Sequence, residues 1–466
     1  MSLVHTLALG LSVVLLSGCA VFSADGGMDA VTSLTQQRTG QIVKRQDADG
    51  GAAAAQARVN QLLAEPLTAD TAVQLALINN RGLQAALSEL GVAEADRVQA
   101  GRLRNPGFSF SRLRGGSDVE IDRGVMFDLL GLLTLPIRSD IESRRFEQIK
   151  LQTVAEAVGL AADTRKAYFS AVAAQQTVQF MEQVKTSAEA GAELAQGMLR
   201  AGNFSKLDQA RHQVFYADAT TQVARAKHNA TATREQLTRL LGLSGTHTAF
   251  KLPERLPDLP VEVPDMPNIE AQAMEQRLDV WMIRRDAEAT AKALGLTQAT
   301  AFVNVLDAGY INKSETGKPR ANGFEISLEL PLFDWNSRSR KAESLYMAAL
   351  HRTADVAVRA RSEVRSAYSA YRNSYDIAQR YRQEIVPLRK TISDEVLLRY
   401  NGMLSSVFEL LADAREQAVS VNAAIESQRD FWLAETDLQL AINGSGSAIT
   451  EMRGQSMAAD HSSGKE

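Results

Sequence analysis

Apolar side chains recur every three or four positions along several long stretches of the chain. In two of these stretches the apolar positions are Val154, Val158, Ala161, Tyr168 and Val172, and then Val364, Tyr368, Tyr371, Tyr375, Ala378 and Ile385. A mean spacing of about 3.5 residues is typical of long helices that pack side by side as a left-handed coiled coil. Residues 139–200 contain no proline, and a helix of that length would extend for about 90 Å. A compact core cannot bury so long a stripe, so these helices need parallel neighbours.

Four shorter stretches read as strands, over residues 108–113, 120–130, 301–311 and 324–330. In the last of them the apolar set is Phe324, Ile326, Leu328 and Leu330, and the polar set is Glu325, Ser327 and Glu329. Arg112 weakens the apolar set of the first stretch. This alternation fits a membrane β-barrel strand with its polar side toward a wet lumen, and it fits equally an amphipathic hairpin on a soluble domain.

The chain is organised as two similar halves. Residues 251–268 hold five of the eleven prolines, which excludes a helix there and predicts an extended linker. On either side of the linker the same signatures recur in the same order: Arg165 and Arg365, Ala167-Tyr168 and Ala367-Tyr368, and Gly202 and Gly402. We therefore expect two structural repeats, residues 67–250 and 269–442, each with a helix, two strands and two long helices.

The resulting fold class is mainly α with a small β part, built of long coiled-coil hairpins and four strands per chain. Four strands cannot enclose a lumen, and an open sheet edge in lipid would leave backbone groups without hydrogen bonds. If the strands form a barrel, several chains must share it, and three chains would supply twelve strands.

The N-terminus resembles that of an exported lipoprotein. Residues 1–18 contain an apolar run that is too short to span a bilayer and suits a signal peptide. Leu16-Ser17-Gly18-Cys19 follows and resembles a lipobox, with Cys19 as the acylated residue. The alternative is a chance Gly-Cys pair after an ordinary signal. We read residues 19–66 as a lipid-anchored extended arm and residues 443–466 as a disordered tail.

The composition argues against several classes of function. A net charge of −4 gives no electrostatic footprint for nucleic acid. Cys19 is the single cysteine, and the six histidines lack metal-ligand spacing. No catalytic motif stands out, so we expect neither an enzyme, a metal site nor a cofactor, apart from the covalent lipid on Cys19.

Several segments together resemble the TolC family of outer-membrane efflux channels. They are LTADTAVQLALINNRGLQAA from Leu67, RNPGFSFS from Arg104, RKAYFSAVAAQQ from Arg165, ISLELPLFDWNSRSRKAE from Ile326 and RYNGMLSSVFELLADAR from Arg399. The resemblance implies a homotrimer in which a twelve-stranded β-barrel in outer-membrane lipid continues as an α-helical tunnel into the periplasm. It also implies two protein partners, a periplasmic adaptor and an inner-membrane pump.

The resemblance places functional residues at the two hairpin tips. Adaptor docking would involve Gly202 and Asn203 in the first half and Gly402 and Met403 in the second. Candidate aperture or gating carboxylates are Asp208, Glu409 and Asp413, although all three read equally well as solvated surface charges. Members of the family often carry an acidic residue six positions after the tip glycine, where this chain has Asp208 in one half but Phe408 in the other. Trp335 is a candidate membrane-interface aromatic, or an ordinary packing residue at a helix start.

We therefore predict a passive export duct in the outer membrane, the channel component of a tripartite efflux system. The alternative is a lipid-anchored periplasmic coiled-coil scaffold without channel activity. The cargo is open between metal ions, drugs and other toxins, because a shared tunnel carries what its pump selects.

Overall fold

A computed structural model describes residues 20–46, 51–303, 305–330 and 335–444. The first half contains α4 (Ala69–Asn79), α5 (Arg81–Ala100), β1 (Gly107–Gly115), β2 (Asp118–Asp128), α6 (Leu129–Arg200) and α7 (Lys206–Leu240). The second half contains α8 (Ile269–Gln276), α9 (Leu278–Ala299), β3 (Val305–Glu315), β4 (Ala321–Glu329), α10 (Trp335–Arg380), α11 (Val386–Asn401) and α12 (Val407–Asn443). The fold class predicted from the sequence is thus confirmed for the single chain.

The chain divides into two compact units, which we describe separately. The first comprises residues up to Val31, Ala86–Thr153 and Asp279–Val358, and the second comprises Thr32–Ala85, Val154–Leu278 and the residues from Arg359. Among the helices that the structure describes, none combines the length and apolar composition that crossing a bilayer requires.

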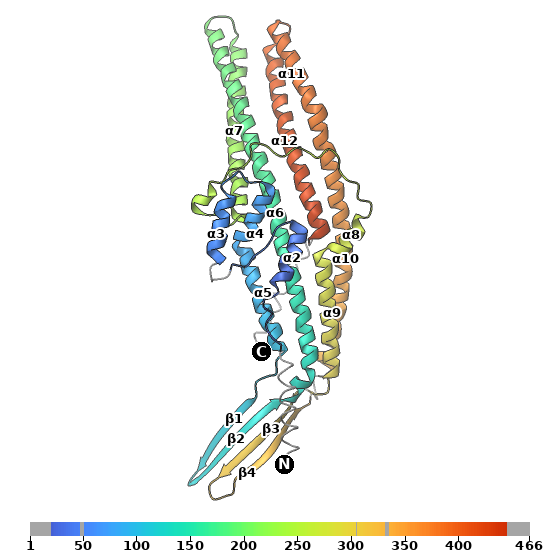
Figure 1. Ribbon diagram of the computed structural model, residues 1–466. Helices are drawn as coiled ribbons and strands as arrows, with labels where there is room; N and C mark the ends of the chain where they lie inside the picture. The colour runs from blue at the N-terminus through green and yellow to red at the C-terminus, as the bar shows by residue number, and fades with distance from the viewer. Residues whose placement is uncertain (1–19, 47–50, 304, 331–334, 445–466) are drawn as a thin grey trace. The chain divides into compact units, whose positions relative to one another are not determined.

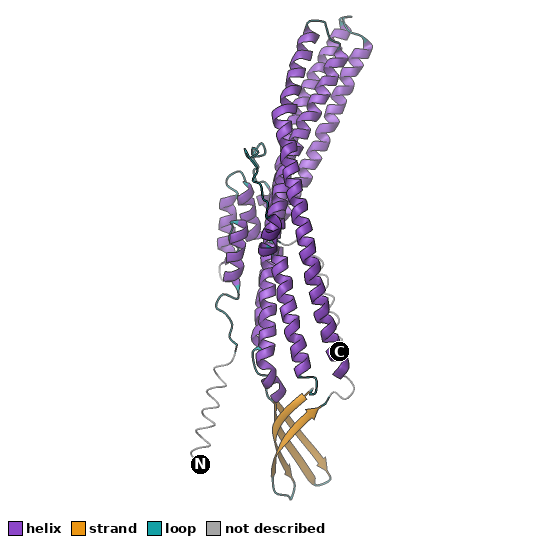
Figure 2. Cartoon of the chain, turned by 90° about the vertical axis from the view of Figure 1, so that its right-hand side faces the viewer, coloured by secondary structure: helices purple, strands orange, loops and turns teal. Residues whose placement is uncertain are grey.

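The first unit holds one four-stranded antiparallel sheet in the order β1-β2-β3-β4 (Figure 1). One row of paired residues runs across all four strands: Phe108 with Val125, Val125 with Tyr310, and Tyr310 with Phe324. Tight turns close the two hairpins, where Gly116 and Gly317 have φ angles of 63° and 77°. Only glycine adopts such angles without steric cost. The sheet in Figure 2 (orange) consists of these two hairpins, one from each half of the chain.

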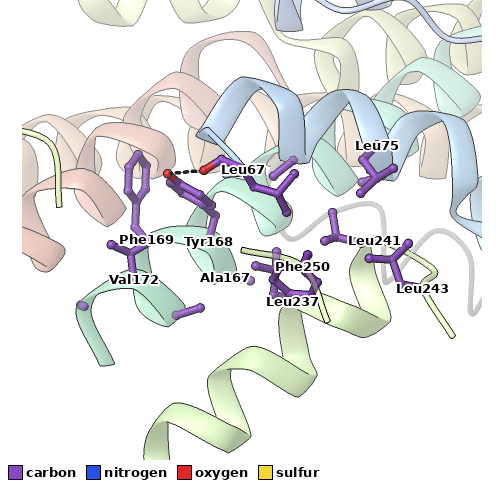
Figure 3. Close-up of a cluster of buried hydrophobic side chains, with 14 of the residues drawn as sticks. Leu67, Leu75, Ala167, Tyr168, Phe169, Val172, Leu237, Leu241, Leu243 and Phe250 are labelled. Atoms are coloured by element: carbon purple, nitrogen blue, oxygen red, sulfur yellow. Dashed lines mark hydrogen bonds between the residues drawn. The ribbon is translucent and has the colours of Figure 1, made fainter. Parts of the chain in front are cut away.

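The second unit is built around long helices, and its main core lies between α4, α6 and α7 (Figure 3). Leu67, Leu75, Val172, Leu237 and Leu241 are all buried there. The Tyr168 hydroxyl donates a hydrogen bond of 3.1 Å to the carbonyl oxygen of Leu67, and burial raises the pKa of Tyr168 to about 12. The hydrogen bond gives the buried hydroxyl a partner inside an otherwise apolar core, as buried polar groups require.

A second core in the same unit follows the 3.5-residue pattern of the second half. Val364, Tyr371, Tyr375 and Ala378 are buried against Phe431 of α12. The helical pattern is then interrupted by a π-helical turn at Tyr381–Ile385, directly before α11. Pro387 explains the interruption, because a proline lacks the N–H that would continue regular helical hydrogen bonding.

Equivalent ion pairs recur in the two halves of the second unit. Arg165 of α6 pairs with Asp70 of α4, and Arg365 of α10 pairs with Glu270 of α8 at 2.9 Å. Each partner lies 200 positions from its counterpart, as a comparison of the residue numbers shows (70 and 270, 165 and 365). The repeated spacing in the sequence therefore corresponds to repeated side-chain contacts.

Two local expectations were wrong. The strand predicted to reach residue 130 ends at Asp128, whose carboxylate accepts a 2.5 Å hydrogen bond from the backbone N–H of Gly131. This capping starts α6 ten residues earlier than predicted, so that Pro136 lies inside the helix. The arm predicted as extended contains two helices, α2 (Met28–Thr39) and α3 (Gly51–Leu62). Val59 of α3 packs into the main core of the second unit.

The proline-rich linker, residues 251–268, has neither helix nor strand. Its backbone carbonyl oxygens instead accept hydrogen bonds from helix side chains. The Trp432 indole donates to Pro257 at 3.2 Å, and the Tyr375 hydroxyl donates to Val261 at 2.7 Å. Side-chain donors thus replace the backbone partners that the prolines remove.

Candidate functional site

One face of the sheet is apolar along the three rows nearest the helices. Its side chains are Phe108, Val125, Phe127, Leu306, Ala308, Tyr310, Phe324, Ile326 and Leu328. These side chains are not part of a core: Phe324 is 90% exposed and Ile326 is 72% exposed. Large apolar side chains exposed in contiguous rows mark a surface that another partner covers.

The opposite face of the same strands is acidic. Its carboxylates are Asp118, Glu120, Asp122, Asp128, Asp307, Glu315, Glu325 and Glu329. Lys313 is the basic residue of this face, and it pairs with Glu120 and Asp122. All carboxylates of the four strands therefore lie on one face, opposite the apolar rows, as the alternation of the last strand predicts.

The first hairpin tip joins α6 to α7 in the second unit. Gly202 has a φ angle of 77°, and Asn203 follows, its N–H bonded to the carbonyl of Met198 at 3.0 Å. The Ser205 hydroxyl caps α7 by accepting from the N–H of Asp208 at 3.0 Å. The Asp208 carboxylate accepts from that hydroxyl and pairs with Arg211 at 3.1 Å. Asp208 thus begins a helix, where a negative charge is favourable.

The second tip, between α11 and α12, uses a different residue in the left-handed conformation. Gly402 has a φ angle of −80°, and Met403 has a φ angle of 59°. The sequence repeat matches Gly402 with Gly202, but the structure has Met403 in the left-handed position of this turn. The N–H groups of Met403 and Leu404 bond to the carbonyls of Tyr400 and Arg399, which is the pattern that Gly202 and Asn203 form with Leu199 and Met198.

This one-residue shift explains the acidic residue that looked misplaced in the sequence. Ser406 caps α12, and Glu409 completes a capping box by accepting from the N–H of Ser406 at 3.1 Å. Glu409 is therefore the structural counterpart of Asp208, counted from Met403 rather than from Gly402. Hydrogen bonds from the Ser405 hydroxyl and from the Ser406 backbone lower the pKa of Glu409. The Ser-x-x-acid spacing in both halves was a sequence signal for these helix starts.

Asp413 lies one turn further along α12, where the Ser393 hydroxyl of α11 donates to its carboxylate. The three candidate aperture carboxylates therefore all hold contacts within their own chain. The serines that bind these carboxylates are Ser205, Ser393 and Ser405, and these contacts were not predicted from the sequence.

The two hairpins contact each other near the tips through α7 and α12. Arg211 lies over the Phe408 ring at 5.2 Å, and Arg415 lies over the Phe215 ring at 5.4 Å. Arg415 also reaches Asp218 at 3.4 Å. Phe408, at the position where the family often has an acid, therefore contacts Arg211 of the other hairpin while its side chain stays 57% exposed.

Two sequence-predicted residues have no described side chain. Cys19 lies outside the described residues, and for Trp335 the structure gives only the backbone at the start of α10. No group of three or more histidine, cysteine, aspartate or glutamate side chains in the described ranges is arranged to hold a metal ion.

Similar folds occur among solved membrane proteins. A membrane protein from Pseudomonas aeruginosa matches with a TM-score of 0.70 and 19% identity, covering 83% of this chain and 93% of that protein. The CmeC outer membrane channel of Campylobacter jejuni matches with a TM-score of 0.67 and 15% identity, covering 86% and 89%. The chain therefore has the fold of outer-membrane channels, and the resemblance to the TolC-like channels is confirmed for the fold.

A curated relative of the chain is the cobalt-zinc-cadmium resistance protein CzcC of Cupriavidus metallidurans. The two chains are 23% identical over 299 residues, which cover 61% of this chain and 70% of that protein. No family model matches the chain.

Proposed function

We propose that the protein is the outer-membrane channel of a tripartite efflux system and that it conducts substrates passively as a homotrimer. The observation that carries this proposal is the sheet with one apolar and one acidic face. Lipid would cover the apolar face, and water in a lumen would contact the acidic one. A lipid-anchored scaffold without a channel would not need this segregation.

The sheet also supplies the reason for a trimer. Strands β1 and β4 are the two edges of the described sheet, and lipid cannot satisfy the backbone groups of a free edge. Pairing β4 of one chain with β1 of the next would close a twelve-stranded barrel from three copies. The hairpins α6–α7 and α11–α12 would then form the periplasmic tunnel, and their tips would meet an adaptor that connects to an inner-membrane pump.

We further propose that Cys19 carries the lipid. The residues that follow it bind the C-terminal end of α5, close in sequence to β1. The N–H of Ala20 donates to the carbonyl of Gly101 at 3.4 Å, and Arg97 donates to the carbonyl of Val21 at 3.2 Å. In the first unit these bonds hold residue 20 beside Gly101 at the end of α5, the helix that precedes β1 in the chain. Mass spectrometry of the N-terminal peptide tests acylation, and an unmodified start beyond Cys19 would refute it.

The cargo that the comparisons favour is a metal cation. CzcC is named for resistance to cobalt, zinc and cadmium, and the acidic face would not repel such cargo. The channel itself would perform no chemistry, and selection would rest with the pump.

A pair of adjacent substitutions tests the two-faced sheet. Ile326→Arg places a charge on the lipid side at a cost of about 2–4 kcal/mol near the bilayer midplane. Ser327→Arg places the same charge one residue further along, on the lumen side. We expect Ile326→Arg to reduce the amount of trimer in outer-membrane fractions, while Ser327→Arg assembles like the parent protein.

Assembly and conduction are then measured on purified protein. Native mass spectrometry in mild detergent should show three chains, and planar bilayers should show discrete conductance. A stable monomer, or equal tolerance of both arginine substitutions, would contradict the proposed function.

A further inference from the structure

The apolar face of the sheet carries charge only in the rows between the apolar band and the hairpin turns, and there the charge has one sign. Arg112 and Arg114 of β1 and Arg123 of β2 are the charged side chains of this face. All three are exposed. The carboxylates of the same strands lie on the other face, because successive strand residues point to opposite sides.

Cross-strand register places these arginines in three successive rows. Arg123 is paired with Phe110 and with Asn312, Arg112 with Ile121, and Arg114 with Val119. The rows nearer the helices hold the apolar band already described. The three rows that hold the arginines are separated by two steps, which together measure about 13 Å along the strands. The arginines therefore form a basic zone of about that height next to the apolar band.

Little within the chain neutralises this zone. Arg123 donates one hydrogen bond of 3.3 Å to the side-chain oxygen of Asn312. Arg112 and Arg114 have no hydrogen bond or ion pair with any residue in the described ranges. Lys313, at the same height on the opposite face, is by contrast paired with carboxylates.

Arginine at the edge of an apolar band suits one ligand chemistry. Its long stem lies along apolar surface while its guanidinium reaches the polar boundary. The guanidinium fork binds phosphate through two parallel hydrogen bonds, which a single ammonium group cannot reproduce. Lipid headgroups present phosphate at that boundary of a bilayer.

We propose that Arg112, Arg114 and Arg123 form a binding surface for the phosphate groups of outer-leaflet lipid. The lipid in question is lipid A, whose headgroup carries phosphate. The inference rests on the proposed function, because it requires the sheet to lie in the outer membrane with its turns toward the outer leaflet. In a trimer the surface would be present three times around the barrel.

The test uses the full chain, purified as a trimer in neutral detergent and titrated with diphosphoryl lipid A under native mass spectrometry. In the triple variant R112Q/R114Q/R123Q we expect the affinity for lipid A to fall by about fivefold for each arginine removed. Monophosphoryl lipid A should bind the parent protein more weakly than the diphosphoryl form. The variant R112K/R114K/R123K, which keeps the charge but not the fork, should recover part of the affinity.

The matched control is Lys313→Gln, which removes one positive charge at the same height from the opposite face and should leave lipid A binding unchanged. Equal lipid A binding by the parent protein and the triple glutamine variant would overturn the inference. Displacement of the lipid by inorganic phosphate at equal concentration would overturn it too, because the surface would then bind the free ion. If the parent protein forms no conducting trimer, the proposed function fails first, so the two failures are distinguishable.

Discussion

At the scale of single residues, the two hairpin tips show how the same turn is built from different amino acids. Gly202 occupies the left-handed position of the first tip, and Met403 occupies that of the second. A residue with a side chain pays about 1–2 kcal/mol in that conformation. Met403 is 95% exposed, so no packing within its chain offsets this cost.

The two tips should therefore respond differently when their glycines are replaced by alanine. Gly202→Ala should destabilise the first tip by about 1 kcal/mol, because alanine is strained at a positive φ angle. Gly402→Ala should have little effect, since its φ angle is negative and an added Cβ would lie 3.4 Å from its nearest neighbour atom. Met403→Gly should stabilise the second tip. Hydrogen exchange of the tip amides measures all three, and a loss of protection in Gly402→Ala like that in Gly202→Ala would contradict the assignment.

Glu409 predicts a pH dependence at the second tip. Its pKa is lowered by hydrogen bonds from Ser405 and Ser406, so the carboxylate stabilises the start of α12 above the ordinary glutamate pKa. That stabilisation should disappear as the pH falls through the lower pKa of the folded state. Hydrogen exchange of residues 405–410 at descending pH should show it. The variant Glu409→Gln serves as the control, and an identical pH profile in the variant would refute the role of the carboxylate.

At the scale of elements, the proline-rich linker acts as a bound segment rather than a free connection. Tyr375 donates to the carbonyls of Pro260 and Val261, at 3.2 and 2.7 Å. Gln428 and Trp432 of α12 both donate to Pro257. The linker thus joins α10 to α12 without any helix or strand of its own.

Removing one donor should loosen the linker. Tyr375→Phe deletes the hydroxyl that donates to the carbonyls of Pro260 and Val261, at a cost of about 0.5–1.5 kcal/mol. We expect faster tryptic cleavage at Arg255. Tyr216→Phe is the matched control, because it removes a hydroxyl bonded to Glu189 in the same unit but away from the linker. Equal cleavage rates in both variants would show that Tyr375 does not hold the linker.

At the scale of the whole molecule, the acidic face of the sheet should determine which ions pass. Eight carboxylates and one lysine per chain, repeated in a trimer, would line the lumen. A ring of carboxylates raises the local concentration of cations and lowers that of anions.

Neutralising this face should reduce cation selectivity. In planar bilayers the double variant E325Q/E329Q should shift the reversal potential in a salt gradient toward that of an unselective pore. Asp413→Asn removes a carboxylate from α12 in the second unit. Its reversal potential shows whether the tip region also contributes to cation selectivity. If the reversal potential of E325Q/E329Q equals that of the parent protein, the acidic face does not line the conducting path.

Within the two repeats, the sequence by itself determined the kinds of elements and their order. The 3.5-residue apolar period, the alternation around Phe324–Leu330 and the proline-rich linker each reflect local patterns that packing must respect. The recurrence of Arg165 and Arg365 indicated two repeats, because duplicated sequence specifies duplicated local structure. The net charge of −4 argued against nucleic-acid binding, and the single cysteine and the histidine spacing argued against a metal site. Neither argument needed three-dimensional information.

Tertiary structure decided what depends on contacts between distant residues. Pairing of β2 with β3 joins two strands from different halves, and only this register shows that eight carboxylates share one face and three arginines lie on the other. Asp128 capping α6, and Met403 replacing Gly402 at the turn, depend on hydrogen bonds whose alternatives differ by about 1 kcal/mol. Such small differences lie below what a residue pattern can resolve, whereas the folded chain selects one arrangement because all its contacts must be satisfied together.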